Sequence, residues 1–282
     1  MSGWGNASPG VYAPSLSETP DPSTLRLVLR GFRLQGRVLY ALLLREMTTR
    51  FGRDQIGFLW VFFEPMILAL AIGTLKHVMD RGGHGGVPPF IFGVIGYAPY
   101  FAFRGMINQA SGALTSNMTL LYHRQIKLFD IMLARGLLQS AVVTMVLLVV
   151  ITGAAWLVEM TPHSVPNLVG GLMLMLLYSH GLAMLVAAGT AAFELTDRVV
   201  HPLTYLALPF SGALTPLHSL PPSWREVLLW NPQPHFHEMM RDGMFGDLLP
   251  AYYDMWYGLS WAIVVNLLGM LALRAARPKL EH

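Results

Sequence analysis

The sequence predicts an all-α membrane protein with six transmembrane helices, an N-terminal amphipathic helix at the membrane interface and a re-entrant segment before the last span. Hydrophobic residues make up 54% of the 282 residues and charged residues only 12%, which is too apolar for a soluble domain of this length. Several apolar runs reach about 20 residues, which crosses a bilayer at about 1.5 Å per residue. The basic residues lie beside these runs, so the formal charge of +3 indicates membrane anchoring and no nucleic-acid partner.

The N-terminal region is expected to hold a flexible cytoplasmic tail followed by a surface helix. Residues 1–23 form the tail, which is rich in Gly, Ser and Pro and lacks the apolar core of a cleavable signal peptide. Residues 24–56 form the amphipathic interfacial helix, because arginines recur on one face and apolar residues lie away from it. These arginines are Arg26, Arg30, Arg33 and Arg37. A solvated charged face on a soluble helix is the alternative interpretation.

Residues 57–282 are predicted to form one transmembrane domain. Its expected spans are 58–79, 90–110, 136–158, 168–192, 201–217 and 252–273. The fifth span is interrupted by Pro202, Pro209 and Pro216 and leads into a stretch that is too polar to face lipid. We therefore expect the fifth span to be broken and the region near 217–250 to be re-entrant.

The distribution of lysine and arginine predicts the orientation in the membrane. With both termini in the cytoplasm, most of the 19 basic residues fall on the inner side. Those that fall outside are Lys76, Arg81, Arg225 and Arg241. The positive-inside rule favours this multi-pass arrangement.

Enzymatic signatures are missing from this sequence. It contains no phosphate-binding GxxxxGK[ST] loop, no HExxH and no GxSxG motif, so no catalytic residue and no cofactor are predicted in this chain. Any energy from ATP would have to come from a partner chain. His235, His237 and Glu238 form the densest group of potential metal ligands, but nothing at zinc-site spacing completes the group, and no metal site is predicted.

Two ionisable residues lie within predicted spans, where an unpaired charge is costly. Glu64 and Arg104 lie at similar depths from the inner ends of the first two spans, about 10 and 12 Å at 1.5 Å per residue. Because these spans follow one another in the chain, one hypothesis is an ion pair between the two side chains. A pore-facing role for either residue is the other hypothesis.

The junction ahead of the first span couples cationic with aromatic residues. Its sequence, residues 45–53, reads REMTTRFGR, and Gly52 and Gly57 allow a tight turn into the membrane. Arginine grips phosphate through two hydrogen bonds and aromatic rings stack on sugars, so the junction suits an anionic, lipid-linked sugar. Anchoring in the headgroup layer is the alternative. Further aromatic candidates for lining a polymer conduit are Trp60, Tyr97 and Tyr100, with core or lipid-facing packing as their alternative.

The segment 117–135 is too charged to span the membrane and too amphipathic for an irregular loop, so it is expected to form a helix on the inner surface. Its exposed Leu120, Leu121 and Tyr122 lie beside Arg124 and suit docking into a groove of a cytoplasmic partner. Lying flat on lipid is the alternative.

Several short motifs follow one another in a specific order and spacing. Leu44-Arg45-Glu46 precedes Arg50-Phe51-Gly52-Arg53, Gly57-Phe58-Leu59-Trp60 and Glu64-Pro65. Later motifs are Leu121-Tyr122, Ala134-Arg135, Asn231-Pro232, His235, Glu238 and Arg241. Together these residues resemble permease subunits of ATP-binding cassette exporters of capsular polysaccharide, of the type 2 export branch. The resemblance covers roughly residues 25–279.

The resemblance implies a permease that pairs with a second copy and binds two copies of a separate cytosolic ATPase, which would bind ATP and Mg²⁺. It implies export of lipid-linked, usually acidic polysaccharide across the inner membrane of a Gram-negative bacterium, with periplasmic and outer-membrane export proteins completing the route. The first motifs then mark the cytoplasmic entry to the conduit, residues 117–124 a coupling helix that contacts the ATPase, and residues 231–241 the outward-facing re-entrant part.

The candidate site residues fall into three groups. The substrate-path candidates are Arg45, Arg50, Phe51, Arg53, Trp60, Glu64, Tyr97, Tyr100 and Arg104. The candidates for ATPase coupling are Asn117, Leu120, Leu121, Tyr122 and Arg124. The candidates in the re-entrant region are Asn231, His235, Glu238 and Arg241.

Some features leave alternatives open. The tail has no counterpart in the family pattern, and Asp54 puts an acidic residue into the usually basic turn after Arg53, so substrate contacts there are open. O-antigen and teichoic-acid exporters share the architecture. From a different class, a membrane-embedded transferase acting on lipid-linked sugars would need paired acids, for which Asp242, Asp247 and Asp254 are loose candidates.

Overall fold

The computed structural model describes residues 22–51, eight residues between 63 and 74, and then 87–113, 127–193 and 195–276. The chain divides into two compact units, Met1–Val38 and Leu39–His282. The described residues contain helices and no strand, which confirms the all-helical prediction for them.

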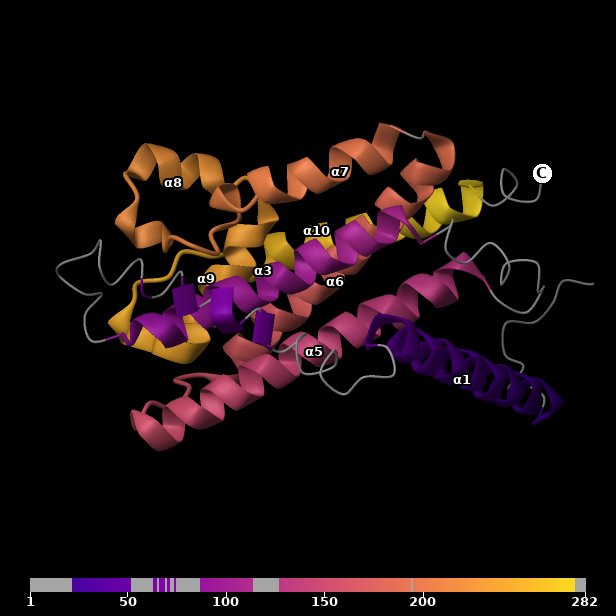
Figure 1. Ribbon diagram of the computed structural model, residues 1–282, viewed down its shortest axis with the longest axis horizontal. Helices are drawn as coiled ribbons and strands as arrows, with labels where there is room; N and C mark the ends of the chain where they lie inside the picture. The colour runs from indigo at the N-terminus through magenta and orange to yellow at the C-terminus, as the bar shows by residue number, and fades with distance from the viewer. Residues whose placement is uncertain are drawn as a thin grey trace, which may run out of the picture. The chain divides into compact units, whose positions relative to one another are not determined.

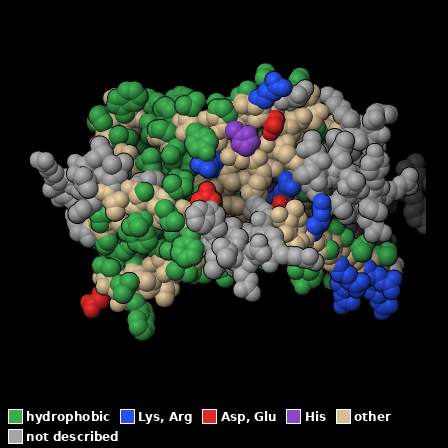
Figure 2. All heavy atoms as spheres, in the orientation of Figure 1, with side chains coloured by type: hydrophobic (Ala, Val, Ile, Leu, Met, Phe, Trp, Pro, Cys, Tyr) green, Lys and Arg blue, Asp and Glu red, His purple; other side chains and the backbone are tan. Residues whose placement is uncertain are grey.

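Helix α1 (Pro22–Phe51) crosses the boundary between the two units. Within the first unit, the arginines of the predicted stripe are exposed, and so are Leu27, Leu29 and Phe32. Figure 2 shows blue side chains gathered on this helix. The helical prediction is confirmed for this segment, whereas its place at a membrane interface stays a prediction.

Four helices of the second unit are long and apolar enough to cross a membrane, judged by length and composition. They are α3 (Pro89–Ser111), α5 (Leu128–Leu157), α6 (Val165–Ala192) and α10 (Met255–Ala276). They correspond to the predicted second, third, fourth and sixth spans. Helix α6 packs against α3 and α10, and α3 packs against α5, so these helices lie side by side (Figure 1).

Capping residues explain where three of these helices begin. Ser164 accepts a hydrogen bond from the Asn167 amide at the start of α6, and Asp254 accepts from the Trp256 and Tyr257 amides at the start of α10. At the start of α5, the Lys127 amide donates to the Asp130 carboxylate over 3.0 Å.

The beginning of α5 corrects one prediction. Residues 128–135 were expected to belong to a separate surface helix, but they form the first two turns of the membrane helix. The reason is that the two charges of this stretch have partners: Asp130 caps the helix, and Arg135 pairs with Glu46.

The predicted fifth span is broken near Pro209 and Pro216, whereas Pro202, also expected to interrupt it, lies inside a continuous helix. Helix α7 (Leu195–Leu206) is only 12 residues long and is followed by the short 3₁₀ turns η2 (Pro209–Ser211) and η3 (Leu217–Ser219). The chain then forms α8 (Pro222–Leu228), α9 (Pro232–Phe245) and the 3₁₀ turn η4 (Gly246–Leu248) before α10 begins. Helix α9 packs against α3, α6 and α10.

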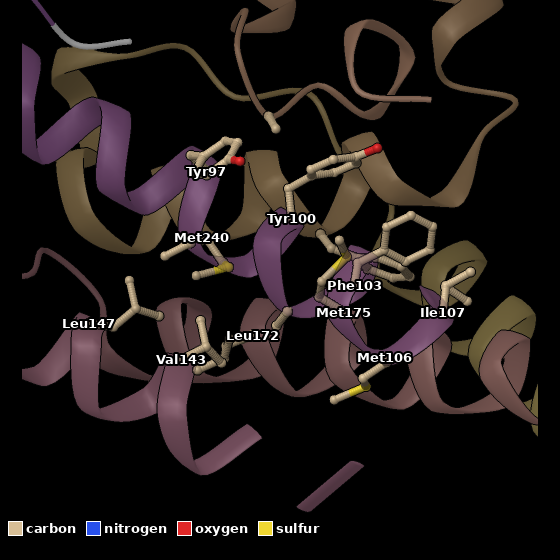
Figure 3. Packing of buried hydrophobic residues seen from close by; sticks show 14 of the residues in the cluster. Tyr97, Tyr100, Phe103, Met106, Ile107, Val143, Leu147, Leu172, Met175 and Met240 are labelled. Atoms are coloured by element: carbon tan, nitrogen blue, oxygen red, sulfur yellow. The ribbon is translucent and has the colours of Figure 1, made fainter. Parts of the chain in front are cut away.

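The hydrophobic core forms around α3. Figure 3 shows Phe103, Met106 and Ile107 of α3 near Leu172 and Met175 of α6, with Val143 and Leu147 of α5 in the same layer. Helix α3 is the most buried of the four long helices, whereas the others expose many large apolar side chains. Exposed apolar faces of this kind are expected where lipid is the solvent.

Candidate functional site

A densely connected polar cluster lies on α9 and centres on Arg241 and Glu238. Both side chains are 1% exposed, and Arg241 Nη1 lies 2.9 Å from Glu238 Oε1. They are three residues apart, so the helix places them on the same face. Hydrogen bonds to the remaining atoms offset the cost of burying such a pair, and here they reach both terminal guanidinium nitrogens but not Nε.

The Arg241 guanidinium also holds the chain that follows α7. Its Nη2 donates to the carbonyl oxygens of Gly212 and Ala213, each over 2.7 Å. Its Cζ lies 4.8 Å from the centroid of the Phe92 ring on α3. Gly212 has φ of 76°, a conformation that favours glycine, and this turn aims the two neighbouring carbonyls at the same guanidinium.

The Glu238 carboxylate holds two further segments. Its Oε1 accepts from the Leu217 amide and its Oε2 from the Tyr252 amide, each over 3.2 Å. The ion pair therefore ties together α9, the turn after α7, η3 and the loop before α10.

The start of α9 is fixed by the other two predicted residues of this region. The Asn231 side chain accepts from the Gln233 amide and donates to the Phe210 carbonyl. His235 uses both ring nitrogens, with Nε2 2.8 Å from the Leu229 carbonyl oxygen and Nδ1 accepting from the Asp254 amide. The structure thus brings Asn231, His235, Glu238 and Arg241 together as a junction between loops; below, these four residues are called the α9 junction.

Close contacts give the depth of α9 between the long helices. Arg241 and the Ala213 carbonyl approach Gly96 of α3, and Met240 and the Phe236 carbonyl approach Gly171 of α6. Gly96 and Gly171 lie seven and six residues inside their helices, or about 10 Å from the helix starts at 1.5 Å per residue. A methyl group at Gly96 would displace the turn at Ala213, and one at Gly171 would displace α9 itself.

A second polar cluster links α9 to the starts of α6 and α10. Asp242 accepts from Asn167 Nδ2 over 2.7 Å and from the Tyr253 hydroxyl over 2.9 Å. Burial, followed by the hydrogen bond to Asp242, raises the pKa of Tyr253 to about 12. A tyrosine hydroxyl is protonated at neutral pH even at its ordinary pKa, so the shift only extends its role as a donor to more alkaline pH. Sequence reasoning offered Asp242 only as a loose acidic candidate and missed this structural role.

The substrate-path candidates on α3 divide into buried and accessible residues. Tyr97 and Tyr100 are core residues, and the Tyr100 hydroxyl donates to the Thr204 carbonyl of α7 (Figure 3). Arg104 is partly exposed, and its Cζ lies 4.5 Å from the centroid of the Tyr205 ring, which is 57% exposed. Tyr205 was not predicted from the sequence, because only the packing of α7 on α3 brings it to Arg104.

The hypothesis of an ion pair between Glu64 and Arg104 is not supported. Among the residues that the structure describes, the ion pairs within 4.0 Å include Glu46 with Arg135 and Glu238 with Arg241, and none joins Glu64 to Arg104. Arg104 instead lies over the face of the Tyr205 ring.

A further cluster lies at the opposite end of the long helices. Glu46 near the end of α1 pairs with Arg135 Nε over 3.1 Å, and Arg135 Nη1 donates to the Gln109 carbonyl of α3 over 2.7 Å. Gln109 Nε2 in turn lies 3.5 Å from Gln139 Oε1 of α5. Arg45, the neighbouring candidate, is exposed on α1. Arg135 therefore ties α1, α3 and α5 together.

The remaining candidate side chains lie outside the described residues. These are Arg50, Phe51, Arg53, Trp60, Asn117, Leu120, Leu121, Tyr122 and Arg124.

Comparison with known proteins identifies the family of this helical membrane domain. The family model described as "ABC-2 type transporter" matches residues 37–245, which is more than half of the chain and includes α3, α5, α6, α7 and α9. The chain belongs to the ABC-2 type transporter family. Its role is therefore transport, and the resemblance found in the sequence motifs is confirmed.

Several curated relatives of this ABC-2 transporter chain cover most of its length. The capsule polysaccharide export inner-membrane protein BexB of Haemophilus influenzae is 30% identical over 87% of this chain and 93% of its own length. The capsule polysaccharide export inner-membrane protein CtrC of Neisseria meningitidis serogroup B is 33% identical over 84% of this chain and 90% of its own. The polysialic acid transport protein KpsM of Escherichia coli is 31% identical over 86% of this chain and 95% of its own.

Proposed function

We propose that this chain is the membrane-spanning permease of an ABC exporter that moves lipid-linked, acidic capsular polysaccharide from the cytoplasm across the bacterial inner membrane. The observation that carries the proposal is the similarity to relatives named for capsule polysaccharide export and polysialic acid transport, each aligned over most of both chains. These names favour capsular polymer over O-antigen or teichoic acid. They also favour transport over the transferase alternative.

The permease works with partners in this proposal. A second copy of the chain completes the pore, and two copies of a cytosolic ATPase bind ATP and Mg²⁺ and drive it. Periplasmic and outer-membrane export proteins carry the polymer onward. Membership of the ABC-2 transporter family supports an ATPase partner.

We propose six spans with both termini in the cytoplasm. Four of these spans are the long helices, and the other two are residues 58–79 and 201–217. The span at 201–217 is broken and consists of the end of α7 and the turns after it. The side at which α3 ends and α5 begins then faces the cytoplasm. The basic residues at this side support the orientation, since Arg45, Lys127 and Arg135 lie near these helix ends.

The domain organisation follows from this topology. Residues 1–23 form a cytoplasmic tail, 24–56 an interfacial helix and 57–282 the permease domain. The region near 217–250 re-enters the membrane from the outer side. The contacts of α9 with Gly96 and Gly171, about 10 Å inside their helices, support this re-entry.

The proposed substrate path begins at the Arg-rich junction of residues 45–53 and continues past Trp60 and Glu64 to Arg104. The partly exposed pair of Arg104 and Tyr205 supports this path, because a cation beside an aromatic face suits an acidic sugar. Residues 117–124 couple the permease to the ATPase. Arg135, which ties α1 and α3 to the first turns of α5, lies 11 residues beyond that segment and is suited to pass its movement onward.

Deletion of this chain in its native host tests the proposal. Surface polysaccharide should be lost and lipid-linked polymer should accumulate in the cytoplasm, because synthesis continues while export stops. Reintroducing the chain should restore the surface polymer, and deleting the neighbouring ATPase should reproduce the defect. Normal surface polysaccharide in the deletion strain would overturn the proposal.

A further inference from the structure

The short helix α8 has an apolar face that nothing in the described chain covers. Trp224 and Val227 are 60% and 63% exposed, and Trp230, just after the helix, is 83% exposed. At 100° per residue, Trp224 and Val227 lie on one face, and Glu226 lies on the opposite face. Leu228 lies at the edge of the apolar face and is buried against the domain. Figure 2 shows hydrophobic side chains gathered where Figure 1 draws α8.

Two contacts fix α8 at the level where a membrane helix begins. The Tyr257 hydroxyl, in the first turn of α10, donates to the Trp230 carbonyl over 2.6 Å. The Arg225 guanidinium carbon lies 4.1 Å from the centroid of the Tyr252 ring, three residues before α10. Because α10 is long and apolar enough to cross the bilayer, its first turn lies near the membrane surface, and α8 must lie there too.

The exposed side chains of α8 are of the types that favour the membrane surface. Tryptophan is enriched at the boundary between headgroups and acyl chains, because its ring is apolar and its N–H seeks a partner. Trp256, in the same first turn of α10, is 70% exposed and is a further tryptophan at this level. Seven residues are too few to cross a bilayer, so a helix at this level lies along the surface.

We propose that α8 is an interfacial anchor whose face formed by Trp224, Val227 and Trp230 is embedded in the headgroup layer of the leaflet where α10 begins. Glu226 points to water in this arrangement, and Arg225 stays against Tyr252. The anchor holds the chain between the broken fifth span and the α9 junction at a fixed depth. The proposal requires only that α10 spans the membrane, so it is independent of which polymer is exported.

Single-cysteine spin labelling tests the anchor, because the chain contains no cysteine of its own. The full-length chain carrying Val227→Cys or Trp224→Cys is reconstituted into phosphatidylethanolamine and phosphatidylglycerol vesicles. Collision of the nitroxide with oxygen, which partitions into lipid, is compared with collision with a water-soluble nickel chelate. The ratio of oxygen to nickel collisions should be several-fold higher at 224 and 227 than at Glu226→Cys, the matched control on the opposite face.

Two results would overturn the proposal. Equal ratios at 226 and 227 would mean that the two faces of α8 lie in the same medium and that the helix does not lie at the boundary. Protection of position 227 from both reagents, as expected for a Leu228→Cys reference buried in the domain, would mean that protein covers the face. Val227→Cys changes one exposed side chain, so this variant carries the test if Trp224→Cys lowers the yield of folded protein.

Discussion

Arg241 in the α9 junction and Arg104 on α3 show two ways of keeping an arginine inside a membrane domain. Arg241 is 1% exposed and has a carboxylate, two carbonyl oxygens and an aromatic face as partners. Arg104 is partly exposed and lies over one tyrosine ring that is itself 57% exposed.

The difference distinguishes an arginine that stabilises the fold from one that can contact a substrate. The partners of Arg241 belong to the chain itself, and although its Nε has no hydrogen-bond partner, the side chain is buried too deeply to meet a substrate. This guanidinium therefore serves to hold loops in place. Arg104 and Tyr205 leave a cationic and aromatic surface accessible, which is what a passing acidic polymer would need. A charged residue in a transmembrane region is thus not by itself a marker of the substrate path.

The largest expected effect comes from breaking the Arg241 pair. Arg241→Leu should lower the free energy of unfolding by about 3–5 kcal/mol, because it leaves the buried Glu238 carboxylate without its partner. Heating followed by size-exclusion chromatography of the detergent-solubilised protein measures this loss. The double variant Arg241→Leu, Glu238→Leu should recover part of it, and strictly additive losses would contradict the pairing.

A smaller loss is expected from Gly96→Ala on α3. The added methyl group would overlap the Ala213 carbonyl oxygen and crowd Arg241 Nη2, so the α9 junction must shift, at a cost of about 1–3 kcal/mol. Gly153→Ala on α5 is the matched control, since a methyl group there meets nothing within 4 Å. Equal unfolding temperatures for the two variants would argue against a tight junction at α3.

The tie between Glu46 and Arg135 should contribute less than the Arg241 pair, because both side chains keep some access to water. A double-mutant cycle with Glu46→Gln and Arg135→Gln should give a coupling free energy of about 1 kcal/mol in the unfolding of the solubilised protein. A coupling free energy as large as that between Arg241 and Glu238 would mean that the Glu46 pair contributes as much to stability as the buried pair on α9.

The smallest effect on stability is expected at the Arg104 contact, where export should suffer instead. Arg104→Gln and Tyr205→Ala should each change the free energy of unfolding by less than about 1 kcal/mol, the usual strength of an exposed cation–aromatic contact. Surface polysaccharide should fall in cells that carry either variant. Tyr205→Phe, which keeps the ring, should export normally; full export by Tyr205→Ala would remove this contact from the substrate path.

The sequence predicted the four long helices because a bilayer imposes a local requirement. An apolar run must be about 20 residues long whatever surrounds it, so α3, α6 and α10 lie close to their predicted bounds. The start of α5 escaped this reasoning. Asp130 and Arg135 make its first turns look like a surface segment, and only their partners show that a membrane helix accommodates them.

For the candidate site, the sequence indicated which residues lie together but not what each of them does. The motif containing Asn231, His235, Glu238 and Arg241 marked residues that do lie together, but sequence spacing did not reveal that they bind loops of their own chain. Tyr97 and Tyr100 looked suitable for a conduit and are packed in the core. Tyr205 and Gln109 carried no signal, because their partners lie about 100 and 26 residues away in the chain.

The sequence by itself therefore determined that this is a helical membrane transporter and approximately where α3, α6 and α10 begin and end. These properties depend on composition, helix length and the order of short motifs, all of which are local along the chain. Only the tertiary structure decided that Arg241 is buried and Arg104 is accessible. That distinction depends on contacts between segments far apart in sequence, such as Arg241 with Gly212 and Arg104 with Tyr205, and on how much water those contacts exclude.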